Sequence, residues 1–373
     1  MKVLLTATVQ SHICQFHKPL VDILHSHGCE VHVAARNNLA EKNGLKLDFV
    51  EKVYDIPFAR SPRSTDNIKA YKYLKEIIRN GKYDVIHCNT PVGGIVTRLA
   101  ANHERKKGTK VFYTAHGFHF YSGAPIKNWL IFYPIEKIFS RFTDTLITIT
   151  QEDYKLAKQH FHCSVKYIHG VGVDEKRYYP VGTDEQVRLR KELGFTPEEK
   201  IILCIGELLP NKNQIMAIHM MRSVVKYFPN AKLLLAGNGP EKANIEKEII
   251  SNGLQNNVIL LGYCTNLEKY QRITDVLVAC SHREGLPLNI VEAMLTANVV
   301  VASINRGHRE LIKNGEDGYL VNSEELMAQK VINLLSNTSL RSKFGKNARA
   351  SVKEYTFTNV KKELEIIYFG NGD

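Results

Sequence analysis

Short apolar runs alternate with amphipathic stretches along the whole chain. The apolar runs predict strands over residues 2–9, 31–35, 84–88, 110–114, 145–149, 200–205, 232–236, 258–261, 275–280 and 299–303. The stretches between them carry apolar residues at helical spacing, which predicts helices between the strands. Such alternation is typical of parallel sheets that are covered by helices on both faces. We therefore expect an α/β protein.

The two halves of the chain begin alike. Residues 2–9 and 200–205 are each followed by a polar loop and an amphipathic helix, and a polar segment over 172–200 separates the halves. This pattern predicts two Rossmann-like, doubly wound domains, over residues 1–172 and 173–357, and a last helix within 358–373. Ligands of such folds bind at the carboxyl ends of the strands, so we expect a site where the two domains face each other across a cleft.

The composition is that of an ordinary globular protein in a reducing compartment. Apolar residues make up 44% and charged residues 24% of the 373 residues, which argues against disorder. The seven cysteines form no Cys-x-x-Cys pair, which favours free thiols and a cytoplasmic protein. No run reaches the ~18 apolar residues of a membrane-spanning helix. The apolar start has no convincing cleavage site and is expected to be the first strand rather than a signal peptide.

Basic residues are concentrated in the first half. Residues 1–180 hold 26 Lys and Arg against 16 Asp and Glu, and the rest of the chain holds 24 against 22, so the first half carries +10 of the net charge of +12. Such a charge suits nucleic acid or an anionic membrane surface. No helix-turn-helix, zinc-finger or RNP pattern occurs, so we expect peripheral membrane association and no nucleic acid.

Two segments could touch a membrane. Residues 60–82 are strongly basic and contain a helical apolar stripe made of Ile68, Tyr71, Leu74 and Ile78. Each basic residue near an anionic surface contributes on the order of 1 kcal/mol. Residues 128–142 combine aromatic and basic residues. For this second segment, a helix in the membrane interface and a helix packed into the first domain are equally good interpretations.

The most informative stretch covers residues 281–295, Ser-His-Arg-Glu-Gly-Leu-Pro-Leu-Asn-Ile-Val-Glu-Ala-Met-Leu. It holds one carboxylate, Glu284, in a glycine-containing loop, and a second, Glu292, on the helix expected to follow. Pro287 suits the first helical position. The unpaired amides of that helix start would bind a diphosphate, and they belong to Leu288, Asn289 and Ile290. An ordinary helix start with two solvated acids fits the spacing equally well.

Further candidates follow the strands of the first half. His116 comes after the strand over 110–114 and would point into the cleft. A metal pair with His119 lacks a third ligand at metal-site spacing, so no metal is expected. The other residues expected to face the cleft are Gln10, Ser11, His12, Thr90, Pro91, Phe118 and His119. Aromatic neighbours of His116 offer faces on which a sugar could pack, and these are Tyr113, Phe118, Phe120 and Tyr121.

These motifs resemble those of a known enzyme family. Glu284 and Glu292 fit the E-x7-E motif of the retaining glycosyltransferases of family 4, which have the two-domain GT-B fold. Supporting elements occur in the family's order: the strand and loop over 4–12, Tyr113-Thr-Ala-His-Gly-Phe-His-Phe120, residues 168–174, and Cys204-Ile-Gly-Glu-Leu-Leu-Pro-Asn-Lys-Asn213. The resemblance covers essentially the whole chain, and is strongest to bacterial exopolysaccharide and capsule glycosyltransferases.

The resemblance implies roles for the charged residues. Glu284 would lie near the donor sugar, Glu292 would hold the ribose, and His116 would sit beside the reacting sugar. The last helix would cross back to the first domain. The remaining donor-binding residues would be Gly206, Glu207, Lys212, Cys264, Gly285, Leu286, Pro287, Leu288, Asn289 and Ile290.

One position departs from the family pattern. The family usually holds the pyrophosphate with an arginine just after the strand glycine and with a lysine about five residues on. Lys212 matches the lysine, but Glu207 stands where the arginine would be. A carboxylate cannot make the charge-assisted contact of an arginine with phosphate. Lys212 and the helix amides are therefore expected to carry more of the binding.

The resemblance implies a cytoplasmic-face glycosyltransferase of exopolysaccharide or capsule synthesis. It would move a hexose or N-acetylhexosamine from a UDP-linked donor to a saccharide on a polyprenyl diphosphate lipid, with retention and without a metal or other cofactor. One alternative is a nucleotide-sugar 2-epimerase, and another is an inactive binding partner in a polysaccharide assembly complex. An NAD-dependent oxidoreductase is excluded because neither half has Gly-x-Gly-x-x-Gly after its first strand.

Overall fold

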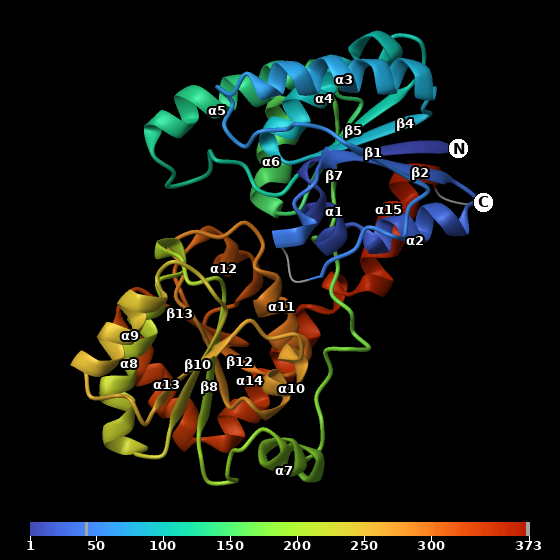
Figure 1. Ribbon diagram of the computed structural model, residues 1–373. Helices are drawn as coiled ribbons and strands as arrows, with labels where there is room; N and C mark the ends of the chain where they lie inside the picture. Colours follow the sequence, from blue (N-terminus) through green and yellow to red (C-terminus); the bar gives the residue numbers. More distant parts are fainter. Residues whose placement is uncertain (42–43, 371–373) are drawn as a thin grey trace. The chain divides into compact units, whose positions relative to one another are not determined.

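The computed structural model describes residues 1–41 and 44–370. The chain divides into two compact units (Figure 1). Unit 1 consists of Met1–Gly172 together with Phe357–Asp373, and unit 2 consists of Val173–Thr356. The last helix therefore belongs to the first unit, as the resemblance implied.

Unit 1 is built on a seven-stranded parallel sheet with the order β3-β2-β1-β4-β5-β6-β7. Its strands are β1 (Lys2–Val9), β2 (Glu30–Arg36), β3 (Lys52–Asp55), β4 (Val85–Asn89), β5 (Lys110–Ala115), β6 (Thr145–Thr148) and β7 (Ser164–Tyr167). Its helices are α1 (Gln10–Phe16), α2 (Lys18–Ser26), α3 (Asp66–Gly81), α4 (Pro91–Arg105), α5 (Ile126–Phe139), α6 (Gln151–His160) and α15 (Phe357–Phe369).

Helices cover both faces of this sheet. The chain steps along the sheet in one direction from β1 to β3 and in the other direction from β4 to β7, so right-handed crossovers place α1 and α2 opposite α3 to α6. Figure 1 shows α3 and α4 on one side of the strands and α2 and α15 on the other. Helix α15 packs against α2, and its Tyr368 Oη lies 2.6 Å from His87 Nδ1 in β4.

The apolar side of α3 is part of the core of unit 1. Leu74 and Ile78 are buried together with Leu4 and Ile86 of the strands. The prediction that the apolar stripe of residues 60–82 faces a membrane is therefore wrong for Leu74 and Ile78. Both side chains belong to the core of unit 1, which requires the same helical spacing of apolar residues. Of that stripe, Ile68 is exposed and Tyr71 is partly exposed.

Unit 2 is built on a six-stranded parallel sheet with the order β10-β9-β8-β11-β12-β13. Its strands are β8 (Ile201–Ile205), β9 (Lys232–Ala236), β10 (Val258–Gly262), β11 (Val276–Ala279), β12 (Val299–Ser303) and β13 (Gly318–Val321). Its helices are α7 (Thr183–Glu192), α8 (Gln214–Tyr227), α9 (Lys242–Ser251), α10 (Leu267–Ile273), α11 (Leu288–Leu295), α12 (Arg306–Leu311), α13 (Glu324–Ser336) and α14 (Thr338–Ser351).

Strand β8 shows why the strands of unit 2 are apolar throughout. Ile202 and Cys204 belong to a core that α8, α9 and α13 cover. Ile201 and Leu203 belong to a second core, on the other face, that includes residues of α7, α10, α11 and α14. Because successive side chains of a strand point to opposite faces, a strand buried on both sides needs an unbroken apolar run.

The predicted α/β architecture with two doubly wound sheets is confirmed. The apolar runs of the sequence did not predict β3, β7 and β13, each of four residues and each at the edge of its sheet. In the part of the chain that the structure describes, no helix has the length and apolar character needed to cross a membrane.

Candidate functional site

In unit 2, two loops at the carboxyl end of the sheet are tied together. The loop after β8 contains Asn211, whose Nδ2 donates to Arg283 O at 3.0 Å. The amide of His282, after β11, donates to Asn211 O at 2.8 Å. These two bonds fix the loop that carries Lys212 against the loop that carries Glu284.

Lys212 and Glu284 form an ion pair in this corner. Lys212 Nζ lies 2.6 Å from Glu284 Oε1, and the two side chains are 24% and 15% exposed. A Cβ at position 206 would lie 3.2 Å from Lys212 Cδ, so the glycine after β8 leaves room for the lysine stem. An ammonium has three donors and can therefore hold the carboxylate and still bind an anionic ligand.

Helix α11 begins one residue later than predicted. Pro287 lies before the helix in an extended conformation (φ −78°, ψ 102°), and Leu288 is the first helical residue. The prediction that the amide of Ile290 is unpaired is wrong, because it donates to Pro287 O at 3.1 Å. Within the described residues, the amides of Leu288 and Asn289 have no acceptor. Two amides rather than three are therefore open to an anion at this helix start.

The start of α11 is also held to the neighbouring strand. Asn289 Nδ2 donates to Ile205 O, at the end of β8, at 2.9 Å. This bond brings the two open amides beside the loop that carries Lys212. The local geometry thus combines an ammonium and a helix N-terminus, both of which attract negative charge.

Glu292 lies one turn further along α11, in a largely buried environment. Burial raises the pKa of its carboxyl to about 7, and the nearby Arg177 and hydrogen bonds from Tyr178 and Gln271 only partly oppose this effect. Arg177 itself is paired with Glu268 at 2.7 Å. The hydroxyls of a sugar that entered this place could donate further hydrogen bonds to the carboxylate.

The other predicted donor-site residues differ in their burial and in their contacts. Glu207 is exposed, and its backbone carbonyl accepts from Gln214 Nε2 at 3.0 Å. Cys264, Leu286 and Leu288 are partly buried and pack against the core of unit 2. Among the residues that the structure describes, Cys264 has no polar partner beyond weak contacts of its Sγ with backbone oxygens.

Helix α12 contributes residues that the sequence analysis did not find. A Cβ at Gly307 would lie 2.7 Å from Glu284 Cβ, so only a glycine lets the start of α12 approach the Glu284 loop this closely. His308 is 1% exposed, and its Nδ1 donates to Ser303 O at 2.7 Å. Burial lowers the pKa of His308, and Glu284 opposes the shift. The predicted strand over 299–303 could have revealed both residues, because they follow its carboxyl end.

In unit 1, His116 directly follows β5, as predicted. Its Nε2 lies 3.2 Å from His12 Nε2 and 3.2 Å from Asn89 Oδ1. Burial lowers the pKa of His116 to about 4, so the imidazole is neutral at pH 7 and can donate a hydrogen bond from one ring nitrogen.

Gln10 and Ser11 were predicted to face a ligand, and this is wrong. They begin α1 rather than a loop, and both are buried. Gln10 Nε2 donates to Ala35 O at 3.3 Å, and Ser11 Oγ accepts from Asn38 Nδ2 at 2.9 Å. Their polar groups therefore hold α1 to the end of β2.

The predicted sugar-packing face at His116 is wrong for three of its four aromatic residues, whereas the fourth, Tyr121, is partly exposed. Tyr113, Phe118 and Phe120 are buried at 2%, 5% and 1% exposure, and the two phenylalanine rings stack within the core with centroids 4.7 Å apart. His119 points elsewhere and stacks on Phe132 with centroids 4.7 Å apart. His119 was predicted to face the cleft, but the histidines that lie beside His116 are His12 and His17.

Thr90 lies between β4 and α4, and Pro91 is the first residue of α4. Thr90 has a positive φ of 65°, a costly conformation for a β-branched residue. Its Oγ1 contacts both the backbone amide of Thr8 at 3.1 Å and Thr8 Oγ1 at 2.7 Å, which holds the strained turn in place. Pro91 is exposed at the first position of α4. A strained turn at a strand end is a feature often found in ligand sites.

Comparison with known proteins defines the class. Residues 185–351 match the family model described as glycosyl transferases group 1, and residues 2–150 match the model described as glycosyl transferase 4-like. A relative from Bacillus subtilis strain 168, named as a glycosyltransferase and called EpsD, is 39% identical over 98% of this chain and 96% of its own. The chain therefore belongs to the family 4 glycosyltransferases.

More distant relatives agree with this class. The UDP-Gal:alpha-D-GlcNAc-diphosphoundecaprenol alpha-1,3-galactosyltransferase of Escherichia coli is 24% identical over 80% of this chain and 82% of its own. The crystal structure of HepE from Anabaena in complex with UDP-glucose matches the fold with a TM-score of 0.77 and 19% identity, over 98% of this chain and 99% of that one. The fold is thus that of the GT-B glycosyltransferases.

Proposed function

We propose that this glycosyltransferase moves a hexose or N-acetylhexosamine from a UDP-linked donor to a saccharide carried on a polyprenyl diphosphate lipid, with retention of the anomeric configuration. The product would enter exopolysaccharide or capsule synthesis. The observation that carries the donor assignment is the corner of unit 2 where the Lys212–Glu284 ion pair lies beside the start of α11. The galactosyltransferase relative acts, by its name, on a UDP sugar and a diphosphoundecaprenol-linked saccharide.

In this proposal the site stabilises the leaving diphosphate without a metal. Negative charge grows on the diphosphate as the bond to the sugar breaks. Lys212 and the open amides of Leu288 and Asn289 are donors already fixed in place, and such donors lower the barrier because they need no reorganisation. Glu284, held by Lys212, would position the donor sugar, and Glu292 would accept hydrogen bonds from the ribose hydroxyls.

His116 is proposed to act on the sugar side of the reaction. With its pKa lowered to about 4, the ring is neutral at pH 7 and can donate a hydrogen bond to a sugar hydroxyl from one ring nitrogen. The basic unit 1 is proposed to take the acceptor. Thr90 and Pro91 at the end of β4 are its further candidate contacts.

Membrane association is proposed to rest on α5 as well as on the charge of α3. Four large apolar side chains of α5 are exposed to solvent: Ile126 at 77%, Leu130 at 72%, Ile131 at 53% and Ile138 at 56%. Other residues of the same helix, Trp129, Phe132 and Tyr133, pack against the core of unit 1. Helix α5 thus has an inner aromatic side and an outer aliphatic side. An outer side of this kind suits the interface of a bilayer, where the protein would bind the cytoplasmic face of the membrane.

The test is a transfer assay with chelator present. A panel of UDP sugars is incubated with a synthetic diphosphoprenyl-linked saccharide, and the product linkage is read by NMR. We expect one UDP sugar of the panel to be a substrate. Its sugar, which is axially linked in the donor, should also be axially linked in the product. Inversion of the anomeric centre would refute retention, and a strict need for a divalent ion would refute the metal-free account. Epimerised UDP sugar in the absence of acceptor would identify the protein as a 2-epimerase instead.

A further inference from the structure

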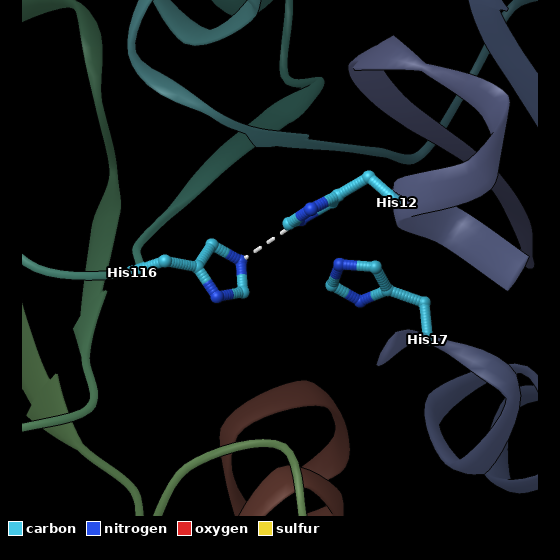
Figure 2. A group of neighbouring side chains, drawn as sticks. All are labelled: His12, His17 and His116. Atoms are coloured by element: carbon cyan, nitrogen blue, oxygen red, sulfur yellow. Dashed lines mark hydrogen bonds between the residues drawn. The ribbon is translucent and has the colours of Figure 1, made fainter. Parts of the chain in front are cut away.

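Three histidines of unit 1 turn their rings toward one another. Figure 2 shows His12, His17 and His116 around a common point. His12 lies on α1, His17 lies at the junction of α1 and α2, and His116 follows β5. One nitrogen from each ring can be chosen so that all three lie within 4.8 Å of one another. All three positions belong to one compact unit, so the fold itself brings them together.

One nitrogen in this cluster is buried without a partner. His17 is 4% exposed, and its Nε2 has no hydrogen-bond partner among the described residues. A buried polar atom that is left unpaired costs about 1–3 kcal/mol. Natural proteins seldom keep such an atom unless a water, an ion or a function accounts for it.

The distances within the cluster suit a small metal ion. Zinc bonds to imidazole nitrogen at about 2.0–2.1 Å in a tetrahedral arrangement, which places neighbouring ligand atoms about 3.3 Å apart. His12 Nε2 and His116 Nε2 lie 3.2 Å apart. Asn89 Oδ1 also lies 3.2 Å from His116 Nε2, so an amide oxygen stands at the same separation. One nitrogen of His17 lies within 4.8 Å of a nitrogen of each of the other two rings, so His17 would have to move closer to complete the set.

A fourth histidine nearby is not available as a ligand. The ring of His87 lies 6.2 Å from that of His17. Its Nδ1 contacts Tyr368 Oη at 2.6 Å and its Nε2 contacts Thr114 Oγ1 at 2.7 Å. Both of its nitrogens are thus engaged, which limits the metal-binding set to three histidines.

We propose that His12, His17 and His116 form a binding site for a divalent transition metal ion of the zinc class. The fourth position would be filled by water or by Asn89 Oδ1, as in sites with three protein nitrogens and one open position. Metal binding itself does not depend on the proposed transfer reaction, because all three ligands belong to unit 1 and binding can be measured without donor or acceptor. The expected effect of the metal on transfer rests on the proposed role of His116. When His116 Nε2 is bound to a metal, this nitrogen can no longer donate to a sugar. Zinc is therefore expected to inhibit transfer, and a chelator is expected to leave transfer unchanged.

The direct test is titration of the full-length, chelator-stripped protein with ZnCl₂ alone, followed by calorimetry. The expected result is one Zn²⁺ per chain, with affinity at least about 10-fold weaker in His12→Gln and in His17→Gln. The matched control is His103→Gln, an exposed histidine of α4 that pairs with Glu104, which should bind Zn²⁺ like the wild type. The absence of saturable binding, or equal binding by a folded His17→Gln variant, would overturn the proposal.

Cobalt provides a second measurement that does not depend on the variants. Co²⁺ in a tetrahedral nitrogen site absorbs visible light strongly, whereas hydrated Co²⁺ absorbs weakly. The wild-type protein with one equivalent of Co²⁺ should show the strong bands, and one equivalent of Zn²⁺ should abolish them. If circular dichroism shows that either glutamine variant does not fold, the Co²⁺ spectrum of the wild type decides: weak, hydrated-type bands would contradict the site.

Discussion

Replacing Glu292 with glutamine should stabilise the protein at alkaline pH while it weakens nucleotide binding. The carboxyl of Glu292 has a pKa of about 7 in the folded chain against 4.5 for the ordinary value, mainly because it is buried. A group whose pKa is raised on folding favours the folded state while it is protonated. Its contribution is therefore complete below about pH 4.5 and is lost as the pH rises through about 7.

The size of this effect follows from the two pKa values. A difference of about 2.5 at about 1.4 kcal/mol per pKa unit gives a ceiling of about 3.4 kcal/mol. Glu292 keeps some solvent exposure, so about 2–3 kcal/mol is the expected gain in the free energy of unfolding for Glu292→Gln at pH 8. At pH 5 the gain should fall below about 1 kcal/mol, because the wild-type carboxyl is then mostly protonated in the folded state.

Scanning calorimetry of the full chain at pH 8 and pH 5 measures the difference. Calorimetry is preferable to tryptophan fluorescence because Trp129, the single tryptophan of the sequence, belongs to unit 1 and would not report on unit 2. Isothermal titration with UDP supplies the second half of the test, with an expected loss of about 10-fold or more in affinity. Equal melting temperatures of the two proteins at pH 8 would refute the reasoning on burial, and unchanged UDP affinity would refute the ribose role. A higher melting temperature together with a lower UDP affinity of Glu292→Gln would mean that the protein retains Glu292 for function at a cost in stability.

Three further predictions concern other parts of the molecule. Lys212→Met should weaken UDP binding by about 10- to 100-fold, because a charged hydrogen bond contributes about 1.5–3 kcal/mol; UDP affinity equal to that of the wild type would remove Lys212 from the diphosphate site. Glu136→Ala should destabilise unit 1 by about 3 kcal/mol, because Arg98 is 1% exposed and loses its 3.0 Å ion-pair partner; a melting temperature within about 1 °C of the wild type would contradict this. Leu130→Glu should reduce co-sedimentation with anionic vesicles, whereas Ile250→Glu, at an exposed apolar site of unit 2, should not; equal binding by both variants would argue against α5 as the membrane contact.

The sequence predicted those parts of the fold that depend on strong local patterns. Strands buried on both faces, such as β8, have continuous apolar runs that are bounded by polar loops, and such runs are readable without a structure. The edge strands β3 and β13 were not predicted. Strands at the edge of a sheet need no uniform apolar run, and four residues are too few to show a period.

The candidate site was predictable where it lies on one continuous stretch, and less so where it depends on tertiary contacts. The loop and helix that carry Glu284 and Glu292 follow from a single motif. The approach of Gly307 to Glu284 depends on a different strand of the sheet. The meeting of His12 and His116 joins residues 104 positions apart, and no local pattern contains that proximity.

Two site predictions failed because the same residue types also serve the core. Phe118 follows the strand that leads to His116, and from sequence alone an aromatic ring there can face either a ligand or the interior. The ring of Phe118 faces the interior, because it stacks on Phe120 within a buried hydrophobic cluster. Gln10 was read as a loop residue, but α1 begins directly after β1 and turns its side chain inward.

Glu284 is the residue on which the proposed donor site depends most directly, and its isosteric replacement is the clearest test. Glu284→Gln removes the charge that is paired with Lys212 at 2.6 Å but keeps the shape of the side chain. With the cognate UDP sugar and a diphosphoprenyl-linked acceptor, the initial rate of transfer should fall at least about 100-fold, and calorimetry should show an intact fold. Transfer at the wild-type rate by the folded variant would contradict the assignment of the donor site to this corner of unit 2.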